Sequence, residues 1–359
     1  MRGWVRQHRG PYKSSLKLVD SLPVPPRPGP DSSDIIVRVS YVALELSIAL
    51  VMGIFPALPL APAFVPEICA SGTVAFAGGQ APEELRTPGT RVLAMTDPMS
   101  MMFFGTGVLK EYIRVPQSCV VPLMKSSDPG ADRPRGTTEH PVLTLAEGAG
   151  LISNGAAALA AVRAANVLSG QRILVNGASG SVGHIVTQLC RARGSYVVGI
   201  ASGANEAFVR EYGCNEFVDY RKYTNLPEYM ASTFGSQPFD SIIDCVGVQE
   251  LWTNSPKYLL QGQPFVNLGA LSMTDDLMAT IYRLTMNNWC PTWLGGVPRP
   301  YILFSNTPKM EDVLTLLEMV QQGKLKVHID SEFAMEDLID AYDRVVSKRA
   351  RGKVLIRLR

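Results

Sequence analysis

Residues 171–183 read Q-R-I-L-V-N-G-A-S-G-S-V-G, and this stretch decides the fold. A β-prone run at 173–175 leads directly into a turn that carries Gly177, Gly180 and Gly183, and a helical pattern begins at once behind it. Strand, glycine turn and helix in this order place free backbone N–H groups and the positive end of a helix dipole where a dinucleotide pyrophosphate binds. The stretch therefore predicts a nicotinamide dinucleotide site, while a structural βα turn without a ligand is the alternative.

Strand-like and helix-like segments alternate on both sides of this turn. Apolar runs such as 196–200 and 241–243 suit strands that are buried on both faces. Repeated alternation of this kind predicts a parallel sheet with helices on both faces, so the fold class is α/β with a doubly wound Rossmann sheet. The predicted strands lie at 172–177, 196–202, 216–220, 240–245 and 264–269.

The segments before and after the alternating region have a different texture. Residues 1–123 are β-rich with many turns, and strands are predicted at 35–39 and 72–76. Residues 125–141 are polar and rich in breakers, which predicts a loop. In the tail we predict helices at 310–321 and 335–346, strands at 326–333 and 353–358, and a helix cap at Gly323.

Composition excludes several classes of protein. The 359 residues are 46% hydrophobic and 18% charged, which is typical of a globular chain long enough for two domains. A net charge of +2 without a long basic tract argues against nucleic-acid binding. Six widely spaced cysteines without a C-x-x-C pair predict reduced thiols, a cytoplasmic location and no structural zinc loop. No apolar leader follows Met1, so we expect no secretory signal.

The uncharged stretch at 46–65 has the length of a membrane span. It contains Pro56, Pro59 and Pro62, and each of these removes a backbone donor that hydrocarbon could not replace. We therefore expect no membrane span, and we interpret the stretch as an apolar wall beside a ligand pocket or as core packing.

The end of the second predicted strand bears on the choice between NAD and NADP. An NAD site usually places an acid there, which bonds the ribose 2′-hydroxyl. This chain has S-G-A-N at 202–205 instead, and these small groups leave room for a 2′-phosphate. Arg210, Arg221 or Lys222 would add positive charge. The pattern predicts NADPH as the cofactor, although Glu206 argues the other way.

Four signatures in this order resemble the medium-chain dehydrogenase/reductase superfamily. They are N-G-A-S-G-S-V-G at 176–183, F-V-D-Y at 217–220, D-C-V-G at 244–247 and G-K-V-L at 352–355. The resemblance covers nearly the whole chain. The branch most similar to it is zinc-free and holds quinone oxidoreductase-like proteins and the trans-acting enoyl reductases of fungal polyketide pathways.

The resemblance implies two domains and a location for the cofactor. A GroES-like, β-rich catalytic domain would consist of residues 1–148 and 297–359, and a Rossmann domain would occupy 149–296. The residues implied to contact the cofactor are Ser179, Gly180, Ser181, Val182 and Gly183 at the pyrophosphate, Ser202, Asn205 and Tyr220 near the adenosine phosphate, Leu268 and Gly269 beside the nicotinamide, and Gly352 and Lys353 from the C-terminal segment. A half-buried strand-end tyrosine is the alternative for Tyr220, and a solvated surface lysine is the alternative for Lys353.

The catalytic domain departs from the pattern of the superfamily. The departures are Leu44, Glu45 and Ser47 in place of an Asn-Pro-x-Asp stretch, Glu67 and Cys69 in place of Gly and Asp, and alanines at 156–157 in place of Leu-Thr. We interpret them as a less polar pocket, which suits a hydrophobic polyketide-like or quinone-like substrate. An inert core thiol is the favoured interpretation of Cys69.

No catalytic residue and no metal site is identified. The zinc-type cysteine near residue 45 is missing, and the four histidines have no ligand spacing, so we expect no metal. His184 begins the helix after the glycine turn, where a packed or exposed helix residue is favoured over a cofactor contact. Without a metal, an enolate needs a backbone N–H, a water or a hydroxyl as donor. The candidate hydroxyls are those of Ser47 and Ser153, which the resemblance places near the pocket.

These patterns together predict an NADPH-dependent, zinc-independent reductase. It would deliver hydride to an enone, an enoyl thioester or a quinone of a hydrophobic small molecule, with the cofactor carrying the redox chemistry. Relatives commonly dimerise through the Rossmann domain, so a homodimer fits the resemblance. A non-redox cyclase or isomerase on the same fold and a non-enzymatic NADPH-binding protein remain as alternatives.

Overall fold

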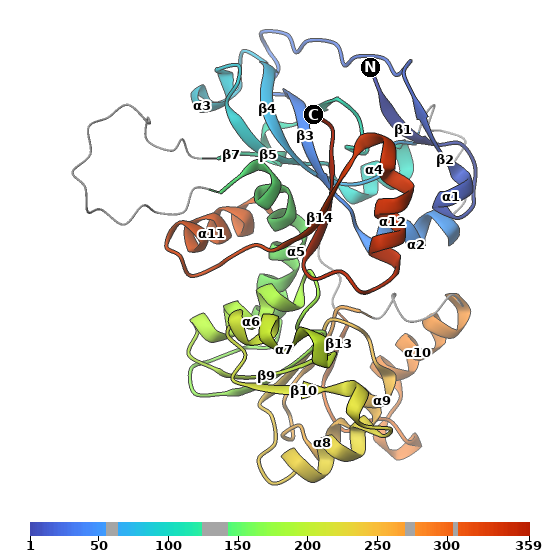
Figure 1. Cartoon of the computed structure of the whole chain (residues 1–359), viewed down its shortest axis with the longest axis vertical. Coiled ribbons are helices and arrows are strands. Elements are labelled where there is room, and N and C mark those ends of the chain that lie inside the picture. The colour runs from blue at the N-terminus through green and yellow to red at the C-terminus, as the bar shows by residue number, and fades with distance from the viewer. Residues whose placement is uncertain (55–63, 124–142, 270–276, 304–307) are drawn as a thin grey trace, which may run out of the picture. The chain divides into compact units, whose positions relative to one another are not determined.

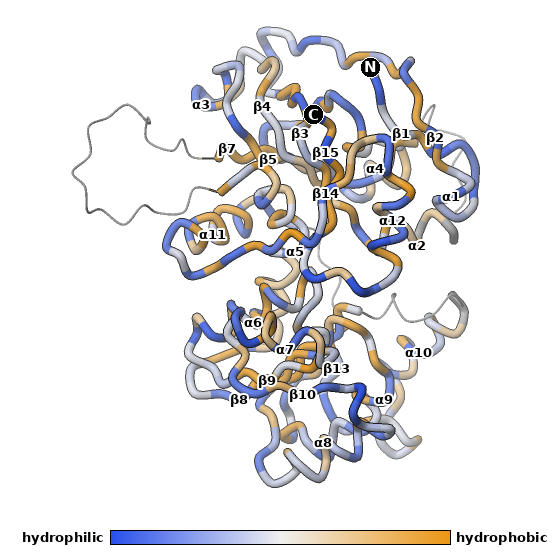
Figure 2. Tube along the Cα trace, viewed as in Figure 1, coloured by the Kyte–Doolittle hydropathy of each residue, from blue (hydrophilic) through white to orange (hydrophobic). Residues whose placement is uncertain are grey.

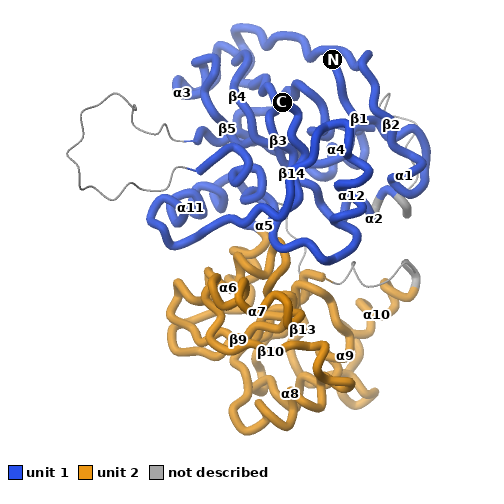
Figure 3. The backbone as a smooth tube through the Cα atoms, viewed as in Figure 1, with its two compact units in different colours: residues 1–156, 307–359 blue, residues 157–306 orange. Residues whose placement is uncertain are grey.

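The chain divides into two compact units, which Figure 3 colours separately. Unit 1 combines Met1–Ala156 with Thr307–Arg359, and unit 2 is Ala157–Asn306. The boundaries predicted from the resemblance, after 148 and after 296, stay predictions. The computed structural model describes residues 1–54, 64–123, 143–269, 277–303 and 308–359.

Unit 2 contains a six-stranded sheet in the order β10-β9-β8-β11-β12-β13, and all of its neighbouring strands are parallel (Figure 1). This order places the first strand, β8, in the interior, as expected for a doubly wound sheet. The strands are β8 (Arg172–Asn176), β9 (Tyr196–Ala201), β10 (Glu216–Asp219), β11 (Ser241–Asp244), β12 (Phe265–Asn267) and β13 (Tyr301–Leu303). The first five confirm the predicted strands, and the short edge strand β13 was missed.

Helical segments connect these strands in unit 2. Apolar residues of the strands, which Figure 2 shows as orange along β9, lie under them. The buried core joins Leu174 and Ile242 of the central strands to Trp252, whose ring lies 5.3 Å from that of Phe265. The helices are α6 (Gly183–Ala192), α7 (Glu206–Glu211), α8 (Leu226–Phe234), α9 (Gln249–Thr253) and α10 (Leu277–Trp289), with 3-10 turns η2 (Gly203–Asn205), η3 (Tyr220–Lys222), η4 (Ser255–Lys257) and η5 (Thr292–Leu294).

Unit 1 is built on a seven-stranded sheet in the order β14-β15-β3-β4-β5-β7, with β6 paired to β3. Its pairs are antiparallel except β14 with β15. The strands are β3 (Ile35–Ala43), β4 (Cys69–Ala77), β5 (Arg91–Met95), β6 (Tyr112–Val115), β7 (Val120–Pro122), β14 (Ile329–Ala334) and β15 (Lys353–Arg357), and a separate hairpin joins β1 (Gly3–Arg6) to β2 (Leu16–Val19). The C-terminal strand β15 therefore completes a sheet that begins in the N-terminal segment.

The helices of unit 1 include the predicted tail helix α11 (Met310–Gln321), which has the predicted bounds. Gly323 follows it with a left-handed φ of 68°, which confirms the predicted cap. The strand predicted at 326–333 begins later, at Ile329. The remaining helices are α1 (Tyr12–Ser15), α2 (Leu46–Ile54), α3 (Glu83–Arg86), α4 (Pro98–Phe104) and α12 (Leu338–Val346), with 3-10 turns η1 (Gln117–Cys119) and η6 (Met335–Asp337).

Helix α5 (Leu145–Ala164) runs across the boundary of the two units in sequence. Among the described residues it is the one helix whose length and apolar character would suit a membrane span, and 72% of its most apolar window is buried inside the structure. Burial of that extent is typical of a core helix. In the uncharged stretch at 46–65, α2 occupies the first part, and residues 55–63 lie outside the described residues, as does the loop predicted at 125–141.

Candidate functional site

The glycine turn between β8 and α6 has the close packing that its sequence predicts. Gly177 has a left-handed φ of 76°, which favours glycine. A Cβ at Gly183 would lie 2.1 Å from the carbonyl oxygen of Gly177, so no larger residue fits there without movement of the backbone. A Cβ at Gly180 would meet nothing closer than that same oxygen, at 3.3 Å. Gly183 thus closes the turn, while Gly180 keeps the space outside it open.

Backbone donors are left over where α6 begins. The N–H of Gly180 is bound to the Gly177 carbonyl, and the later amides of the helix find carbonyl partners in the turn. The amides of Ser181, Val182 and Gly183 make no hydrogen bond to the part of the chain that the structure describes. Such N–H groups at the positive end of a helix dipole bind a phosphate. The turn therefore fits a pyrophosphate.

His184 takes no part in that group of donors. Its side chain is buried, its Nδ1 lies 2.9 Å from the Gly180 carbonyl oxygen, and its ring packs edge-on against Tyr212 at 5.4 Å. Of the packed and exposed positions that the sequence left open, the structure shows the packed one.

A second group of predicted residues lies after β9. The amide of Asn205 donates a hydrogen bond of 2.9 Å to the hydroxyl of Ser179, so the glycine turn and the η2 turn are tied together across 26 residues. Ser202 directly precedes η2, and its side chain makes no capping hydrogen bond to that turn. The exposed Tyr220 lies in η3, directly after β10. Because β8, β9 and β10 are parallel neighbours, all of these residues lie at one edge of the sheet.

The charged side chains at this edge include an ion pair and a carboxylate that were not expected. Arg210 is bound to the carboxylate of Glu206 at 2.9 Å, so this pair supplies little net charge. Arg221 stacks over the ring of Tyr220, 5.8 Å from its centre. Asp219, which sequence reasoning missed as a site residue, is the last residue of β10. Its carboxylate lies so close to Gly203 that a Cβ on Gly203 would be 2.4 Å from it. The F-V-D-Y signature contains this aspartate at the end of a predicted strand. Because the strand ends of a parallel sheet converge, its position near the second strand end could have been predicted.

Buried Asp244 organises the loop that follows β11. Its carboxylate accepts hydrogen bonds from the amides of Val246, Gly247 and Val248 and from the side chain of Asn176, at 2.8 to 2.9 Å. Burial raises the pKa of Asp244, and these donors lower it. The aspartate of the D-C-V-G signature therefore shapes the loop.

Leu268 and Gly269 follow β12 and pack against that loop. The Leu268 amide donates to the Asp244 carbonyl, and the Gly269 amide donates to the Asn267 side chain at 2.9 Å. A Cβ at Gly269 would lie 2.1 Å from the backbone of Val246. The predicted nicotinamide loop is therefore in contact with the loop after β11, on the same edge of the sheet as the glycine turn.

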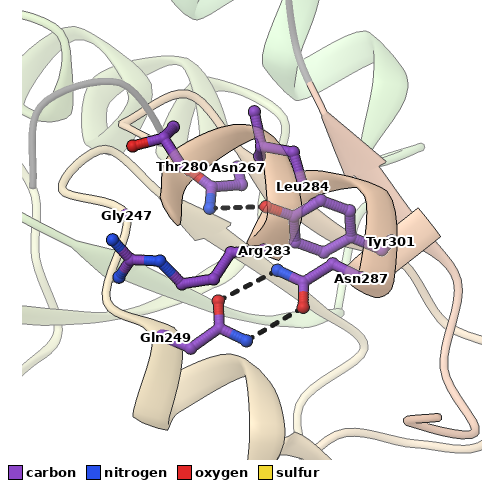
Figure 4. A pocket seen from close by; sticks show the side chains of 8 residues that line it. All are labelled: Gly247, Gln249, Asn267, Thr280, Arg283, Leu284, Asn287 and Tyr301. Carbon is purple, nitrogen blue, oxygen red and sulfur yellow. Dashed lines mark hydrogen bonds between the residues drawn. The ribbon is translucent and has the colours of Figure 1, made fainter. Parts of the chain in front are cut away.

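A small polar recess lies beside these loops, between α9, α10 and the last two strands (Figure 4). Two amides, of Gln249 and Asn287, bond each other reciprocally at 2.9 and 3.0 Å, and Asn267 donates to the hydroxyl of Tyr301. The lining residues are Gly247, Gln249, Asn267, Thr280, Arg283, Leu284, Asn287 and Tyr301. Its side chains largely satisfy one another, so we assign it a structural role in holding α10.

In unit 1 the predicted residues Gly352 and Lys353 occupy a closed position. Gly352 has a φ of 78°, and a Cβ there would lie 2.2 Å from the His328 carbonyl oxygen. The Lys353 side chain is buried, so the surface-lysine alternative is wrong. Its ammonium donates to Glu45 Oε1 at 2.6 Å and to Asn154 Oδ1 at 3.3 Å. Sequence reasoning gave Glu45 and Asn154 no such role.

A second carboxyl group lies in the same buried region. Glu67 Oε1 accepts from the hydroxyl of Tyr342 at 2.5 Å, and Oε2 accepts from the Glu45 amide at 3.2 Å. Burial raises the pKa of Glu67 to about 8, and the charge of Glu45 adds to this, while Tyr342 and Lys353 oppose it. The region expected to be less polar than in relatives thus contains a charged, hydrogen-bonded cluster of Glu45, Glu67, Asn154, Tyr342 and Lys353.

The remaining catalytic candidates differ in accessibility. Ser47 is exposed on α2, and Ser153 is half-buried on α5, next to Asn154. Cys69 is fully buried, and burial raises the pKa of its thiol, which fits the inert core thiol favoured from the sequence. All six cysteines are free thiols. Within the described residues no group of three or more His, Cys, Asp or Glu side chains is arranged to hold a metal ion.

Comparison with known proteins identifies the family of this chain. The zinc-binding dehydrogenase family model matches residues 212–356. The chain is 78% identical to the medium chain reductase pydE of Acremonium sp, over 100% of this chain and 99% of that protein. It is 31% identical to the trans-enoyl reductase poxH of Penicillium oxalicum (strain 114-2 / CGMCC 5302), over 100% and 98%. The chain therefore belongs to the medium-chain dehydrogenase/reductase superfamily and is an oxidoreductase.

The solved structures agree on the fold. A quinone oxidoreductase from Coxiella burnetii matches with a TM-score of 0.76 at 20% identity, over 100% of this chain and 99% of that chain. The predicted fold class, a Rossmann sheet together with a GroES-like β-rich domain, is confirmed.

Proposed function

We propose that this protein is an NADPH-dependent reductase that delivers hydride to an activated C=C bond of a hydrophobic, polyketide-derived substrate without a catalytic metal. The observation that carries the proposal is that the amides of Ser181, Val182 and Gly183 have no hydrogen-bond partner among the described residues, at the start of α6 and in a turn that requires glycine at 177 and 183. The names of the relatives support the reductase class and the enoyl type of substrate.

The preference for NADPH rests on the edge of the sheet beyond that turn. When bound, the cofactor supplies the hydride and leaves as NADP⁺. Ser202 and Asn205 leave room for a 2′-phosphate, and the carboxylate of Glu206 on α7 is paired with Arg210, while that of Asp219 lies beside Gly203. We propose cofactor contacts for five further residues because they lie at that same edge of the sheet: Ser179, Gly180, Tyr220, Leu268 and Gly269. The cofactor contact of Gly352 and Lys353 stays a prediction from the resemblance.

Binding and turnover measurements test this proposal directly. We expect calorimetry to give an NADPH dissociation constant at least tenfold below that of NADH. We also expect NADPH oxidation, followed by its absorbance, with at least one member of a panel of hydrophobic enones, enoyl thioesters and quinones. Substrate conversion without cofactor consumption would instead support the cyclase or isomerase alternative. NADPH binding without any turnover would support the binding-protein alternative.

We also propose a cytoplasmic location and a hydrophobic small molecule as the main partner. The free thiols are compatible with a reducing compartment. A homodimer through the Rossmann domain is proposed from the resemblance, and sedimentation velocity measures it.

A further inference from the structure

The buried cluster of unit 1 contains hydrogen-bond donors that have no acceptor. Because the Lys353 ammonium can only donate, the oxygen of the Asn154 amide must face it, and the Nδ2 group points away. Asn154 is 3% exposed, and its Nδ2 finds no acceptor in the described chain. A buried amide without a partner is costly, so such a group calls for an explanation.

The ammonium beside this amide has a donor to spare as well. Of its three N–H groups, one is bound to Glu45 and one to Asn154, and the described residues offer the third no acceptor. Nδ2 and Oδ1 belong to one amide, and Oδ1 lies 3.3 Å from the ammonium, so the two spare donors belong to neighbouring groups. The Glu45 side chain is 13% exposed, so the cluster reaches the surface of its unit on that side.

Glu45 and Asn154 also fix where the lysine points. A buried ammonium needs a counter-charge, which Glu45 supplies at 2.6 Å, and two hydrogen bonds restrict a side chain that otherwise has many rotamers. The cluster holds one ammonium and two carboxyls, so a proton retained on Glu67 leaves it electrically neutral. A rigid donor pair in a dry, neutral environment is the arrangement that stabilises a developing oxyanion.

We propose that Lys353 and Asn154 bind the carbonyl oxygen of the substrate and stabilise it as it becomes an enolate oxygen. This inference rests on the proposed function, adds a substrate contact to it, and assigns Lys353 to the substrate in place of the cofactor contact that the resemblance implies. Hydride adds to the β-carbon, the C=C pair moves to form the enolate, and the oxygen carries the negative charge between the two donors. A water then protonates the α-carbon, the C=O bond forms again, and the resulting hydroxide takes a proton from the solvent.

Turnover of matched variants tests the proposal. Asn154→Asp keeps the shape and the oxygen that faces Lys353, replaces the Nδ2 donor by a second carboxyl oxygen, and adds a carboxyl group to the cluster. With an enone that the wild type reduces, we expect kcat to fall about 10²-fold, the typical effect of losing one oxyanion donor, with the NADPH dissociation constant within twofold. Lys324→Met, at an exposed lysine after α11, is the control and leaves kcat unchanged. Unchanged kcat in Asn154→Asp would overturn the proposal and assign the donors to a buried water.

Removal of the lysine gives the second arm. Lys353→Met alone leaves a buried carboxylate unpaired, so the double variant Lys353→Met with Glu45→Gln keeps the cluster neutral and folded. We expect a loss of kcat comparable to that of Asn154→Asp and unaltered NADPH binding. Weakened NADPH binding with kcat retained would place Lys353 in the cofactor site and overturn the proposal.

A saturated ketone separates this inference from the proposed function. The probe 2-undecanone has the acceptor oxygen and no C=C bond, so its binding requires no redox step. With NADP⁺ present, we expect calorimetry to show about tenfold weaker binding to Asn154→Asp than to the wild type, as for the loss of one hydrogen bond. Equal binding would overturn the inference, even if the wild type reduces enones. If Asn154→Asp binds the ketone more weakly but the wild type oxidises no NADPH with any substrate, the inference stands and the proposed reductase function is wrong.

Discussion

Glu67 combines an unfavourable backbone conformation with a buried carboxyl group. Glu67 has a left-handed φ of 69°, a conformation that disfavours side chains, and it buries its carboxyl completely. The resemblance places a glycine at this position in relatives, and the positive φ explains why glycine suits it. Here the Tyr342 hydroxyl and the Glu45 amide bond the carboxyl and hold it in place.

The raised pKa of Glu67 makes stability depend on pH. Its folded pKa of about 8 lies above the ordinary value of 4.5, so the native state keeps a proton that the unfolded chain loses. The contribution of Glu67 is therefore full below pH 4.5 and is lost as the pH rises to about 8. We expect Glu67→Gln to be most stabilising, relative to wild type, near pH 8 to 9. Urea unfolding at several pH values measures this, and a difference that is constant with pH would contradict it.

Ser202 carries the prediction about cofactor choice. Ser202→Asp places a carboxylate where the 2′-phosphate of NADPH is proposed to lie. In NADH, the ribose 2′-hydroxyl at that position would donate a hydrogen bond to the carboxylate. We expect the NADPH dissociation constant to rise at least tenfold and that of NADH to stay level or fall. Fluorescence titration with both cofactors measures the ratio. A parallel change for the two cofactors would show that Ser202 does not face this phosphate.

At the scale of elements, the β8–α6 turn separates two roles of glycine. Gly183 is needed by the protein itself, since its Cβ would meet the Gly177 carbonyl at 2.1 Å. Gly180 has no such neighbour, so its small size serves whatever lies outside the turn. The loops after β11 and β12 repeat the first role at Gly269, which packs on the backbone of Val246.

This difference predicts opposite outcomes for two glycine variants. Gly180→Val should fold normally and lose NADPH binding by at least 10²-fold, because its side chain fills the space proposed for the pyrophosphate. Gly183→Ala should instead lower the free energy of unfolding by about 1–3 kcal/mol through overpacking. Thermal unfolding and calorimetry on both variants check the pair. Retained NADPH binding in a folded Gly180→Val would place the cofactor elsewhere.

At the scale of the whole molecule, the C-terminal segment completes the sheet of unit 1. Strand β15 pairs with β3 through Leu355, Ile356 and Arg357. The indole of Trp4, near the N-terminus, donates to the Met335 carbonyl at 2.7 Å, 331 residues along the chain. Unit 1 is therefore stabilised by contacts between the two ends of the chain.

Truncation of a side chain in β15 tests that contribution. Ile356 is completely buried opposite Val42, so Ile356→Ala should cost about 2–5 kcal/mol of unfolding free energy. The control is Leu314→Ala on α11, where the side chain is 47% exposed and a change of about 0.5 kcal/mol or less is expected. Denaturant unfolding measures both. Equal effects would mean that β15 adds little to the stability of unit 1.

Local patterns in the sequence were sufficient for the nucleotide-binding half of this protein. The turn at 177–183 and the five apolar strands form as predicted because each depends on neighbours within a few residues. Strand ends of a parallel sheet then converge by geometry, which brings Ser179 and Asn205 together. Edge strand β13, with three residues, carried too short an apolar run to be recognised.

The buried cluster was decided by the tertiary structure alone. Glu45 and Lys353 are 308 residues apart, and Glu67 and Tyr342 are 275 apart, so no local pattern pairs them. The pairing of β15 with β3 brings these side chains into one buried region. There the cost of burying each charge or hydroxyl is offset by the others. The sequence by itself determined that the chain carries a dinucleotide-binding fold, whereas which polar groups meet in unit 1 depended on how distant strands pair.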